Sequence, residues 1–352
     1  MTTTTPRRST AAALDSADAR RSTRHWTVPL VLVAISLVLS VVTLGIGTAG
    51  IGVGDAVGML VGATDPGKTH IMLQFLSPRV ILCWLVGIGL AVSGSVLQGV
   101  IRNPLAAPDI IGITKGAGVG AMLMLLWFPM APTGAIPVAA FVGGLLAALL
   151  VYVFAYRRGT SPVRLALVGI AVSALCEAII RLLIVRNPPD VNAALIWLTG
   201  SLFGRSMSDV WQFLPWVVVL VPLIVLYARR LDVLGLGDDL AAGLGEPVER
   251  TRRLVLLLAV ALASASVAVA GTVGFIGLIA PHIARSLVGG RHLALLPSSA
   301  AVGVTLMLVS DAIGRGLIPP TEIPVGLVTA FIGGPYFLYL LAKLARSTTS
   351  GR

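Results

Sequence analysis

Long apolar segments recur along this chain, and they constrain its fold more than any other feature. A segment of roughly 17 to 25 mostly apolar residues can cross the hydrocarbon core of a bilayer as a helix. The chain is 56% hydrophobic and only 12% charged, whereas soluble domains carry about 25% charged residues. We therefore predict an all-α integral membrane protein with about ten transmembrane helices, near residues 28–46, 80–98, 110–128, 135–156, 163–185, 211–228, 254–271, 274–288, 294–313 and 323–342.

The basic residues predict the orientation, because Lys and Arg in short loops are retained on the cytoplasmic side during insertion. An even number of spans puts both termini on one side. With that side in the cytoplasm, all but six of the 26 basic residues lie inside, and the six outside are Lys68, Arg79, Arg181, Arg186, Arg205 and Arg315. We predict a multi-pass protein of the plasma (inner) membrane, N-in and C-in. The net charge of +11 is scattered over inner loops, so the expected surroundings are membrane lipid and not nucleic acid.

Polar segments flank the predicted membrane domain, which runs from residue 28 to 346. Residues 1–27 are rich in Thr, Ser, Ala and Arg, a composition typical of disorder, and residues 347–352 form a second short tail. A cleaved signal peptide is the alternative at the N-terminus. However, the apolar run from Val28 is long enough to span, and no small-residue cleavage site follows it. We predict a disordered cytoplasmic tail at the N-terminus and a short cytoplasmic tail at the C-terminus.

Motifs of catalysis or nucleotide binding are weak in this chain. Residues 62–69 match the G-x4-G-K-[ST] spacing of a phosphate-binding loop. They lie in a predicted external loop, without the strand before and the helix after that such a loop needs. The four histidines are dispersed, and no Ser/His/Asp or paired-carboxylate set is visible. We expect no enzyme activity, no cofactor and no metal.

An internal repeat predicts how the helices are organised. Residues 93–96 (SGSV) and 270–273 (AGTV) lie 177 positions apart, and the same offset aligns Pro104 with Pro281. We predict two halves of five helices each, residues 28–185 and 211–346. An odd number of spans per half places the second half upside down relative to the first, which is the inverted repeat of many transporters. Because the match is short and small residues are common here, coincidence stays open.

Gly/Pro-broken apolar segments at corresponding places in two halves typically form the gates of transporters, since unwound backbone needs protein or water around it. Such segments lie at residues 98–108 and 274–282. From them we predict a translocation path or gate, and from the residues alone ordinary helix ends are an equally good interpretation. The candidate gate residues are Gln98, Asn103, Pro104, Gly274, Pro281 and His282.

Three runs resemble signatures of a known family. They are residues 98–121 (QGVIRNPLAAPDIIGITKGAGVGA), 271–285 (GTVGFIGLIAPHIAR) and 322–341 (EIPVGLVTAFIGGPYFLYLL). Together they are similar to the FecCD-type permeases of ABC importers for iron-siderophores, haem and cobalamin, over about residues 30–341. Two departures are visible: Leu76 stands where the family often has Arg, and Met207 where Trp is frequent.

The resemblance implies partners: a second membrane subunit, two cytoplasmic ATPase subunits and an external substrate-binding protein. The longest predicted inner loop between spans resembles the family's coupling helices. Its leucines recur at helical spacing beside acidic residues, so a short apolar face could enter a groove on the ATPase; a solvated interfacial helix is the alternative. The predicted coupling residues are Leu236, Gly237, Asp238, Asp239, Leu240, Leu244, Gly245 and Glu246.

The resemblance also implies that arginines at the outer mouth meet carboxylates of the binding protein. Arg315 matches one such position. The other corresponds to Leu76, which leaves Arg79 as the nearest basic residue, with a helix-end anchor as its alternative role. A second, non-identical permease that keeps the missing arginine would restore the contact. We therefore predict a heterodimer rather than a homodimer.

Two other functional classes stay open on the residues. An ion-coupled secondary transporter needs ionisable groups in mid-span, and the candidates are Glu177 with Arg181, and Asp311 near an outer end. A polytopic membrane enzyme would need convergent catalytic groups. The cargo is not named by the sequence, and iron-siderophore is our prediction from the resemblance, with haem and cobalamin as alternatives.

Overall fold

The computed structural model describes residues 8–47, 50–128, 130–132, 134–155, 162–187, 191–319 and 321–349. These residues form helices and connecting turns without a strand, which confirms the all-α class. In chain order the elements are α1 (Arg8–Leu44), α2 (Val53–Leu60), α3 (Pro66–Ile71), the π-helical turn η1 (Met72–Leu76), α4 (Ser77–Ile101), α5 (Ile113–Trp127), α6 (Ala135–Ala155), α7 (Pro162–Arg186), α8 (Val191–Leu198), α9 (Met207–Leu226), α10 (Ala228–Gly235), α11 (Asp238–Gly243), α12 (Val248–Ala270), α13 (Ile276–Val288), α14 (His292–Gly316) and α15 (Val325–Thr349).

Eight helices of the described chain are long and apolar enough to cross a membrane. Helices α5 and α13 are apolar but only 15 and 13 residues long. At 1.5 Å per residue they span about 20 Å, short of the roughly 30 Å hydrocarbon core. The chain reaches ten crossings only if these two helices cross together with the non-helical segments before them, 102–112 and 271–275. The count of ten stays a prediction.

Helices α4, α12 and α14 form the centre of the bundle. Their apolar stretches are 83%, 72% and 67% buried, against 22% to 33% for the other five long spans. Glycines permit close packing around α4: a Cβ on Gly94 would lie 1.9 Å from the carbonyl oxygen of Gly277 on α13, and one on Gly303 of α14 would lie 2.4 Å from that of Gly87. Small residues at such crossings let backbones approach in the absence of a hydrophobic force between helices. The outer helices therefore turn apolar faces toward lipid or partner subunits.

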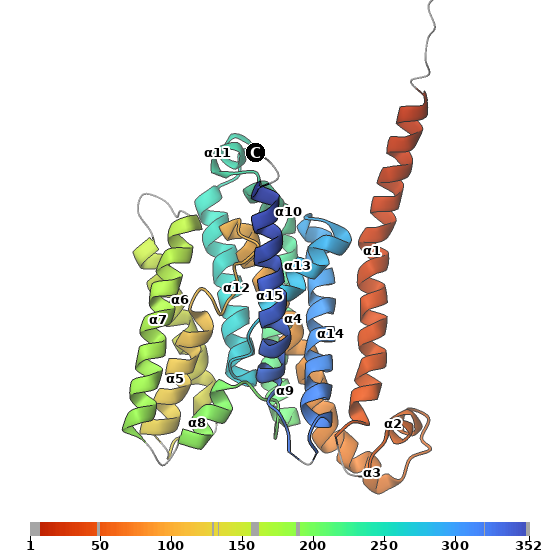
Figure 1. Ribbon diagram of the computed structural model, residues 1–352, viewed down its shortest axis with the longest axis vertical. Coiled ribbons are helices and arrows are strands. Elements are labelled where there is room, and N and C mark those ends of the chain that lie inside the picture. Colours follow the sequence, from red (N-terminus) through yellow and green to blue (C-terminus); the bar gives the residue numbers. More distant parts are fainter. Residues whose placement is uncertain are drawn as a thin grey trace, which may run out of the picture.

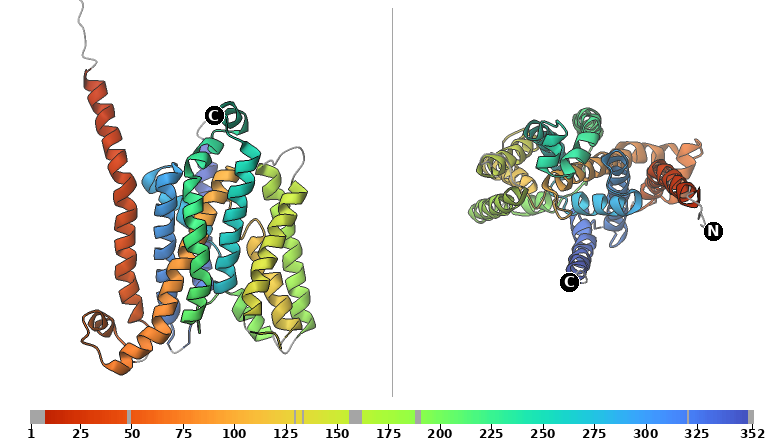
Figure 2. Two further views of the ribbon diagram at one scale, coloured as in Figure 1. Left: turned by 180° about the vertical axis from the view of Figure 1, so that it is seen from behind. Right: turned by 90° about the horizontal axis from the view of Figure 1, so that it is seen from above.

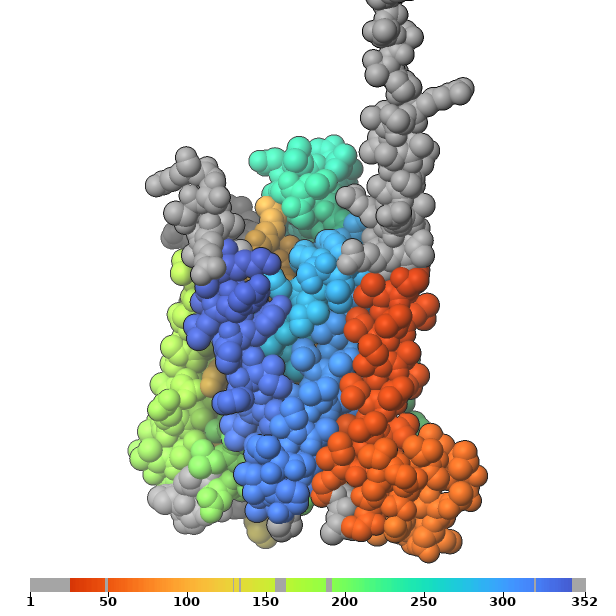
Figure 3. All heavy atoms as spheres, turned by 45° about the vertical axis from the view of Figure 1, so that its right-hand side comes forward, coloured from red at the N-terminus to blue at the C-terminus, as the bar shows by residue number. Residues whose placement is uncertain are grey.

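The two ends of the bundle differ in what they carry. Both ends of the described chain lie at one end together with α10 and α11, and α2, α3 and α8 lie at the other (Figure 1). We call these the α11 end and the α8 end. Across one face, α1, α14, α15 and α7 follow one another (Figure 3). Because both ends of the described chain lie at the α11 end, the number of crossings is even. Assignment of that end to the cytoplasm stays a prediction.

Helix α1 begins at Arg8, and its membrane-spanning part is Trp26–Leu44. The helix thus enters the segment 1–27 for which we expected disorder. That expectation followed from polarity and overlooked the Ala, Leu and Arg residues at 11–21, which are strong helix formers. Residues 1–7 and 350–352 lie outside the described residues, and the other domain boundaries stay predictions.

The order of helices repeats along the chain. The series α1, α4, α5, α6, α7 and the series α9, α12, α13, α14, α15 each have a short helix in third place. Helix α5 lies toward the α8 end and α13 toward the α11 end (Figure 1), as an inverted repeat requires. The residue alignment with an offset of 177 is wrong, however. Pro104 lies in the turn after α4, and Pro281 lies inside α13, because the match rested on common small residues.

The segment that mimics a phosphate-binding loop is a capped helix start. The carboxylate of Asp65 accepts hydrogen bonds from the backbone N–H groups of Gly67 and Lys68 at the beginning of α3. The Lys68 ammonium lies 2.9 Å from the Asp55 carboxylate. A backbone hydrogen bond from Gly52 and the contact with Lys68 lower the pKa of Asp55. The lysine of the motif is therefore committed to an internal ion pair.

Candidate functional site

The predicted coupling segment forms two short helices at the α11 end. Helix α10 buries Ala228, Leu231 and Leu234 against the bundle. Gly237 then turns the chain with a φ of 113°, a value that favours glycine. Beyond that residue α11 projects from the bundle (Figure 1). The three predicted leucines, Leu236, Leu240 and Leu244, are 57%, 63% and 67% exposed, so this segment presents apolar side chains outward, as a partner-binding helix does.

Ion pairs fix α11 to the bundle. The Asp238 carboxylate lies 2.6 Å from the Arg252 guanidinium on α12, and it also pairs with Arg102 in the turn after α4. Arg252 is almost fully buried. Glu246 accepts a hydrogen bond from the Thr251 hydroxyl. Asp238 was predicted as a coupling residue, whereas both arginine partners were missed, since no local spacing connects them to it.

A second contact ties α10 to α14. One oxygen of Asp232 accepts a hydrogen bond from the backbone N–H of His292, at 2.8 Å, and lies 2.6 Å from its ring Nδ1. His292 is 4% exposed. Its other ring nitrogen packs against Gly99 of α4, which has room for it only because glycine has no side chain. A Cβ added to Gly99 would lie 2.6 Å from that nitrogen. The contact therefore joins α10 to the start of α14, beside the end of α4. The pair was not predicted, because its residues lie 60 positions apart.

The first broken segment follows α4. The Gln98 side chain is buried, and its amide donates to the carbonyl oxygen of Leu278 on α13 at 3.2 Å. Arg102 ends α4 in the left-handed region, with a φ of 51°. The Asn103 side-chain oxygen then accepts from the backbone N–H of Leu105 at 2.9 Å. This local bond replaces helical hydrogen bonding, so Asn103 and the following Pro104 form a true turn, as predicted.

The second broken segment lies against the first. Gly274 leads into Phe275, which adopts a φ of 66° just before α13. The backbone N–H of Phe275 points to the Asp109 carboxylate at 3.4 Å. A Cβ on Gly274 would lie 3.7 Å from that carboxylate. The two breaks are therefore joined directly through Asp109, a residue that the sequence did not single out.

Pro281 and His282 do not form the turn that we expected. Both lie within α13. Pro281 lacks the N–H that would bond the carbonyl oxygen of Gly277 one turn earlier, and that oxygen is where Gly94 packs closely. His282 lies edge-on to Tyr336 of α15, with ring centroids 6.0 Å apart. The Gly277 carbonyl oxygen thus faces α4, and His282 borders α15 and not a loop.

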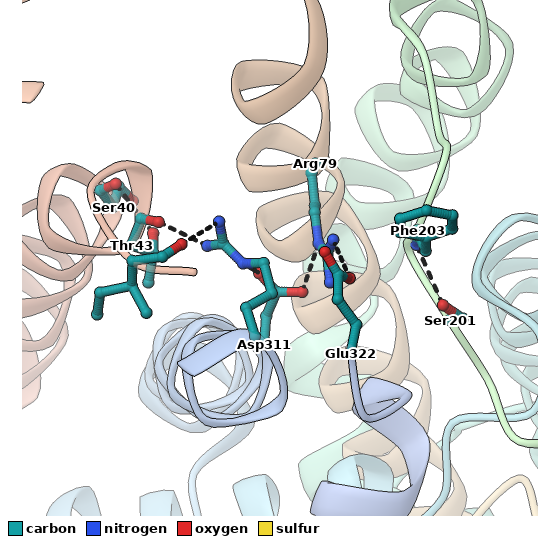
Figure 4. Close-up of polar contacts among 9 residues, drawn as sticks. Ser40, Thr43, Arg79, Ser201, Phe203, Asp311 and Glu322 are labelled. Carbon is teal, nitrogen blue, oxygen red and sulfur yellow. Dashed lines mark hydrogen bonds and ion pairs between the residues drawn. The ribbon is translucent and has the colours of Figure 1, made fainter. Parts of the chain in front are cut away.

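The two predicted docking arginines lie in a buried network at the α8 end, and Figure 4 shows Arg79 of this network with Asp311 and Glu322. Arg79 is 2.7 Å from Asp311 and 2.7 Å from Glu322. Arg315 is 3.0 Å from the other oxygen of Asp311, without hydrogen-bond geometry. Its remaining nitrogens donate to the carbonyl oxygens of Ile46 and Thr43 at 2.9 and 2.6 Å. The network joins the end of α1, α4, α14 and the segment before α15.

This geometry does not present the arginines to an external partner. Arg79 is 6% exposed and Arg315 2% exposed, and the Glu322 side chain, 26% exposed, is the most accessible carboxylate of the network. Two arginines face two carboxylates, so their charges balance inside the protein. The helix-end anchor, considered as the alternative for Arg79, fits the contacts better. A docking role for either arginine has no support from this arrangement.

The chain that forms these broken segments, α10, α11 and the bundle around them matches one known family. A model of the FecCD transport family matches residues 32–343. The chain belongs to that family. The resemblance stated from three sequence runs is confirmed. FecCD proteins are membrane permease subunits of ABC importers and not themselves enzymes, and they work with ATPase and substrate-binding partners.

Individual relatives of this FecCD permease match along nearly their whole length. The Fe(3+)-citrate import system permease protein YfmE of Bacillus subtilis (strain 168) is 48% identical over 93% of this chain and 98% of its own. The iron(3+)-hydroxamate import system permease protein FhuG of the same organism is 40% identical, over 90% of this chain and 97% of its own. A second Fe(3+)-citrate permease protein there, YfmD, is 36% identical, over 93% and 98%.

The fold is also that of a solved transporter. An inward-facing metal-chelate type ABC transporter superposes with a TM-score of 0.80 at 31% identity, covering 90% of this chain and 99% of that one. The predicted class, a multi-pass membrane permease without its own ATPase site, is therefore established. The roles of single residues and the orientation in the membrane are taken up as proposals below.

Proposed function

We propose that this chain carries an iron(III) chelate, either ferric citrate or a ferric siderophore, through the cytoplasmic membrane. The observation that carries the proposal is the 48% identity, over 93% of the chain, to a permease of an Fe(3+)-citrate import system. The hydroxamate permease among the relatives extends the same chemistry to siderophores. The substrate would arrive on an external binding protein, and ATP would be hydrolysed by a separate subunit.

Uptake measurements test the cargo. A strain without its own ferric-chelate importers would express this permease with its ATPase and binding protein. It would then receive labelled ferric citrate, a ferric hydroxamate, haem or cobalamin. We expect accumulation of at least one ferric chelate that stops when the permease gene is deleted. Accumulation of haem or cobalamin, with neither ferric chelate entering, would overturn the assignment.

The α11 helix is the proposed contact with the ATPase, with Leu236, Leu240 and Leu244 as its apolar face. Their exposure supports this, since exposed leucines on one face of a projecting helix can enter an apolar groove on a partner. The polar residues of the segment have a second role in the proposal. Asp238 transmits movement of α11 to Arg102 at the first break and to Arg252 on α12, and Glu246 fixes the segment's end through Thr251.

The translocation path is proposed to follow the two breaks. Gln98 connects α4 to α13, and Asp109 connects the first break to the second. A displacement at Arg102 can therefore pass along the chain through Asn103 and Pro104 to Asp109, and from Asp109 to the segment that begins at Gly274. His282 is placed by its contact with Tyr336 at the side of α13 that faces α15, and Pro281 leaves that helix short of one hydrogen bond.

We further propose that the α11 end is cytoplasmic and that the permease functions as a heterodimer. The orientation rests on the excess of basic residues in loops at that end. The heterodimer is supported by Leu76, which replaces a common family arginine, and by the existence in one organism of two different Fe(3+)-citrate permease proteins similar to this chain. Reconstitution of this chain alone with its ATPase, giving full uptake driven by the binding protein, would rule out an obligatory heterodimer.

A further inference from the structure

An apolar cavity opens on the side of the bundle between α1 and α9, with α4 and α14 behind it. Its volume is about 390 Å³, and its lining includes Trp26 of α1, Trp84 of α4, Val221 of α9 and Leu293 of α14. Seen from behind, α4 and α14 are visible between α1 and α9 (Figure 2). The Trp84 indole is fixed by its hydrogen bond to the Ser40 hydroxyl, at 2.8 Å.

A second, polar cavity continues the first toward the α11 end. It measures about 240 Å³ and is lined by Trp26, Arg229, Asp232, Arg291, Leu293 and Ala294. Trp26 and Leu293 line both cavities, so the two form one groove with a charged mouth and an apolar interior. Trp26 also begins the membrane-spanning part of α1, which is the depth at which tryptophans mark the interface between lipid and water.

The mouth of this groove is positively charged. Arg229 and Arg291 are both exposed, and within the described part of the chain no ion pair or hydrogen bond occupies either guanidinium. The one acid in the lining, Asp232, is engaged by His292, whose backbone N–H and ring nitrogen both lie within 2.8 Å of the same carboxylate oxygen. The mouth therefore offers two free cations beside a carboxylate that already has partners.

We propose that this groove binds an anionic phospholipid of the surrounding bilayer. The phosphate lies between Arg229 and Arg291, and one acyl chain follows the apolar part past Trp84. Basic pockets between transmembrane helices at a membrane surface suit anionic headgroups, and an apolar groove on a lipid-facing side suits an acyl chain. A soluble phosphate would use the mouth and leave the apolar part unexplained, so the geometry favours the lipid.

Such a lipid would fill the space between α1 and α9. Lower in the bundle α1 is held to α14 directly, through the Ser36 and Thr305 hydroxyls, which lie 2.9 Å apart. Only 22% of the spanning part of α1 is buried. Near Trp26 the helix is separated from α9 by the groove. The bound lipid therefore acts as a packing partner for α1 near Trp26, where the groove separates it from α9.

Native mass spectrometry of the full-length permease, purified with its ATPase subunits, tests the headgroup. After delipidation the complex would receive phosphatidylglycerol or phosphatidylcholine with identical acyl chains. We expect preferential retention of phosphatidylglycerol. Arg229→Gln with Arg291→Gln should weaken it by about fivefold for each arginine and about thirtyfold together. The matched control, Arg250→Gln with Lys343→Gln, removes the same charge outside the groove and should change nothing.

Fluorescence quenching tests the apolar part. Phosphatidylglycerol brominated on its acyl chain, added at one equivalent per permease, should quench tryptophan emission, and Trp26→Phe with Trp84→Phe should abolish most of that quenching. Equal retention of the two lipids by the native complex, or equal loss in the control variant, would overturn the proposal. So would displacement of the lipid by an equal concentration of glycerol phosphate, or absence of quenching because a partner subunit fills the groove.

Discussion

The stability of the permease should fall much more when the buried network at the α8 end loses one charge than when it loses an oppositely charged pair. Asp311 is 1% exposed and lies 2.7 Å from Arg79 and 3.0 Å from Arg315. Asp311→Asn would leave Arg315 with two backbone carbonyls as its polar partners in the described structure, while Arg79 would keep Glu322. Removing one partner of a buried ion pair costs about 3 to 5 kcal/mol. Because Arg79 stays paired, we expect the lower end, about 3 kcal/mol.

Thermal unfolding of the purified permease would measure this loss. At roughly 2 to 4 °C per kcal/mol, Asp311→Asn should lower the Tm by about 6 to 12 °C. The double variant Asp311→Leu with Arg315→Leu removes both charges of one pair, a change that is often nearly neutral, and should lower it less. The double variant should therefore lose less in Tm than Asp311→Asn does.

Glu177 supplies a matched control. It also contacts two cations, Lys115 at 2.6 Å and Arg181 at 3.1 Å, but its side chain is 32% exposed and theirs are 44% and 75% exposed. Exposed pairs contribute about 0 to 1 kcal/mol, so Glu177→Gln should shift the Tm by about 4 °C or less. Equal shifts for Asp311→Asn and Glu177→Gln, or a double variant worse than the single one, would refute the reasoning.

Three further predictions follow from the coupling helix, the helix crossing and the two breaks. Leu240→Asp should weaken ATPase association about thirtyfold, as loss of an interface anchor does, with membrane insertion unchanged; stoichiometric co-purification of the ATPase would contradict this. Gly94→Ala should reduce the yield of folded permease, because its Cβ meets a backbone carbonyl at 1.9 Å, whereas Gly54→Ala, with open space around it, should not. Cysteines at Asn103 and Gly274 should react with thiol reagents at rates that depend on nucleotide, and rates indifferent to ATP would leave both breaks as structural turns.

The sequence predicted what depends on local pattern. Apolar length located the spans, the leucine spacing of residues 236–244 located the exposed face of the coupling segment, and Asn103-Pro104 located a real turn. The eighth span was expected at 274–288, and α13 begins at Ile276. These features are determined by residues that are close together in the sequence, so they can be predicted from it.

Contacts between distant residues could not be predicted in the same way. Asp232 with His292 and Asp109 with Phe275 join positions 60 and 166 residues apart. Arg79 was proposed for docking because it is the basic residue nearest to Leu76, and its contacts with Asp311 and Glu322, 232 and 243 residues away, could not be read from local spacing. For Arg315 there was a local signal, since its i,i+4 spacing from Asp311 permits an ion pair on one helix face.

The position of the polar contacts explains how a largely apolar bundle could transmit motion along its length. Apolar side chains can slide past one another, so packing alone transmits displacement weakly, whereas a buried hydrogen bond that breaks leaves an unsatisfied group. Here the polar contacts lie at the joints: Asp238 between α11, α12 and the first break, Asp232 between α10 and α14, and Asp109 between the two breaks. Each of these contacts connects a short helix or a helix break to a longer, buried part of the bundle. If α11 binds the ATPase as proposed, its movement would pass through Asp238 to Arg102, along the chain to Asp109, and from there to Phe275. The breaks would yield first, because there the backbone has no helical hydrogen bonds to lose.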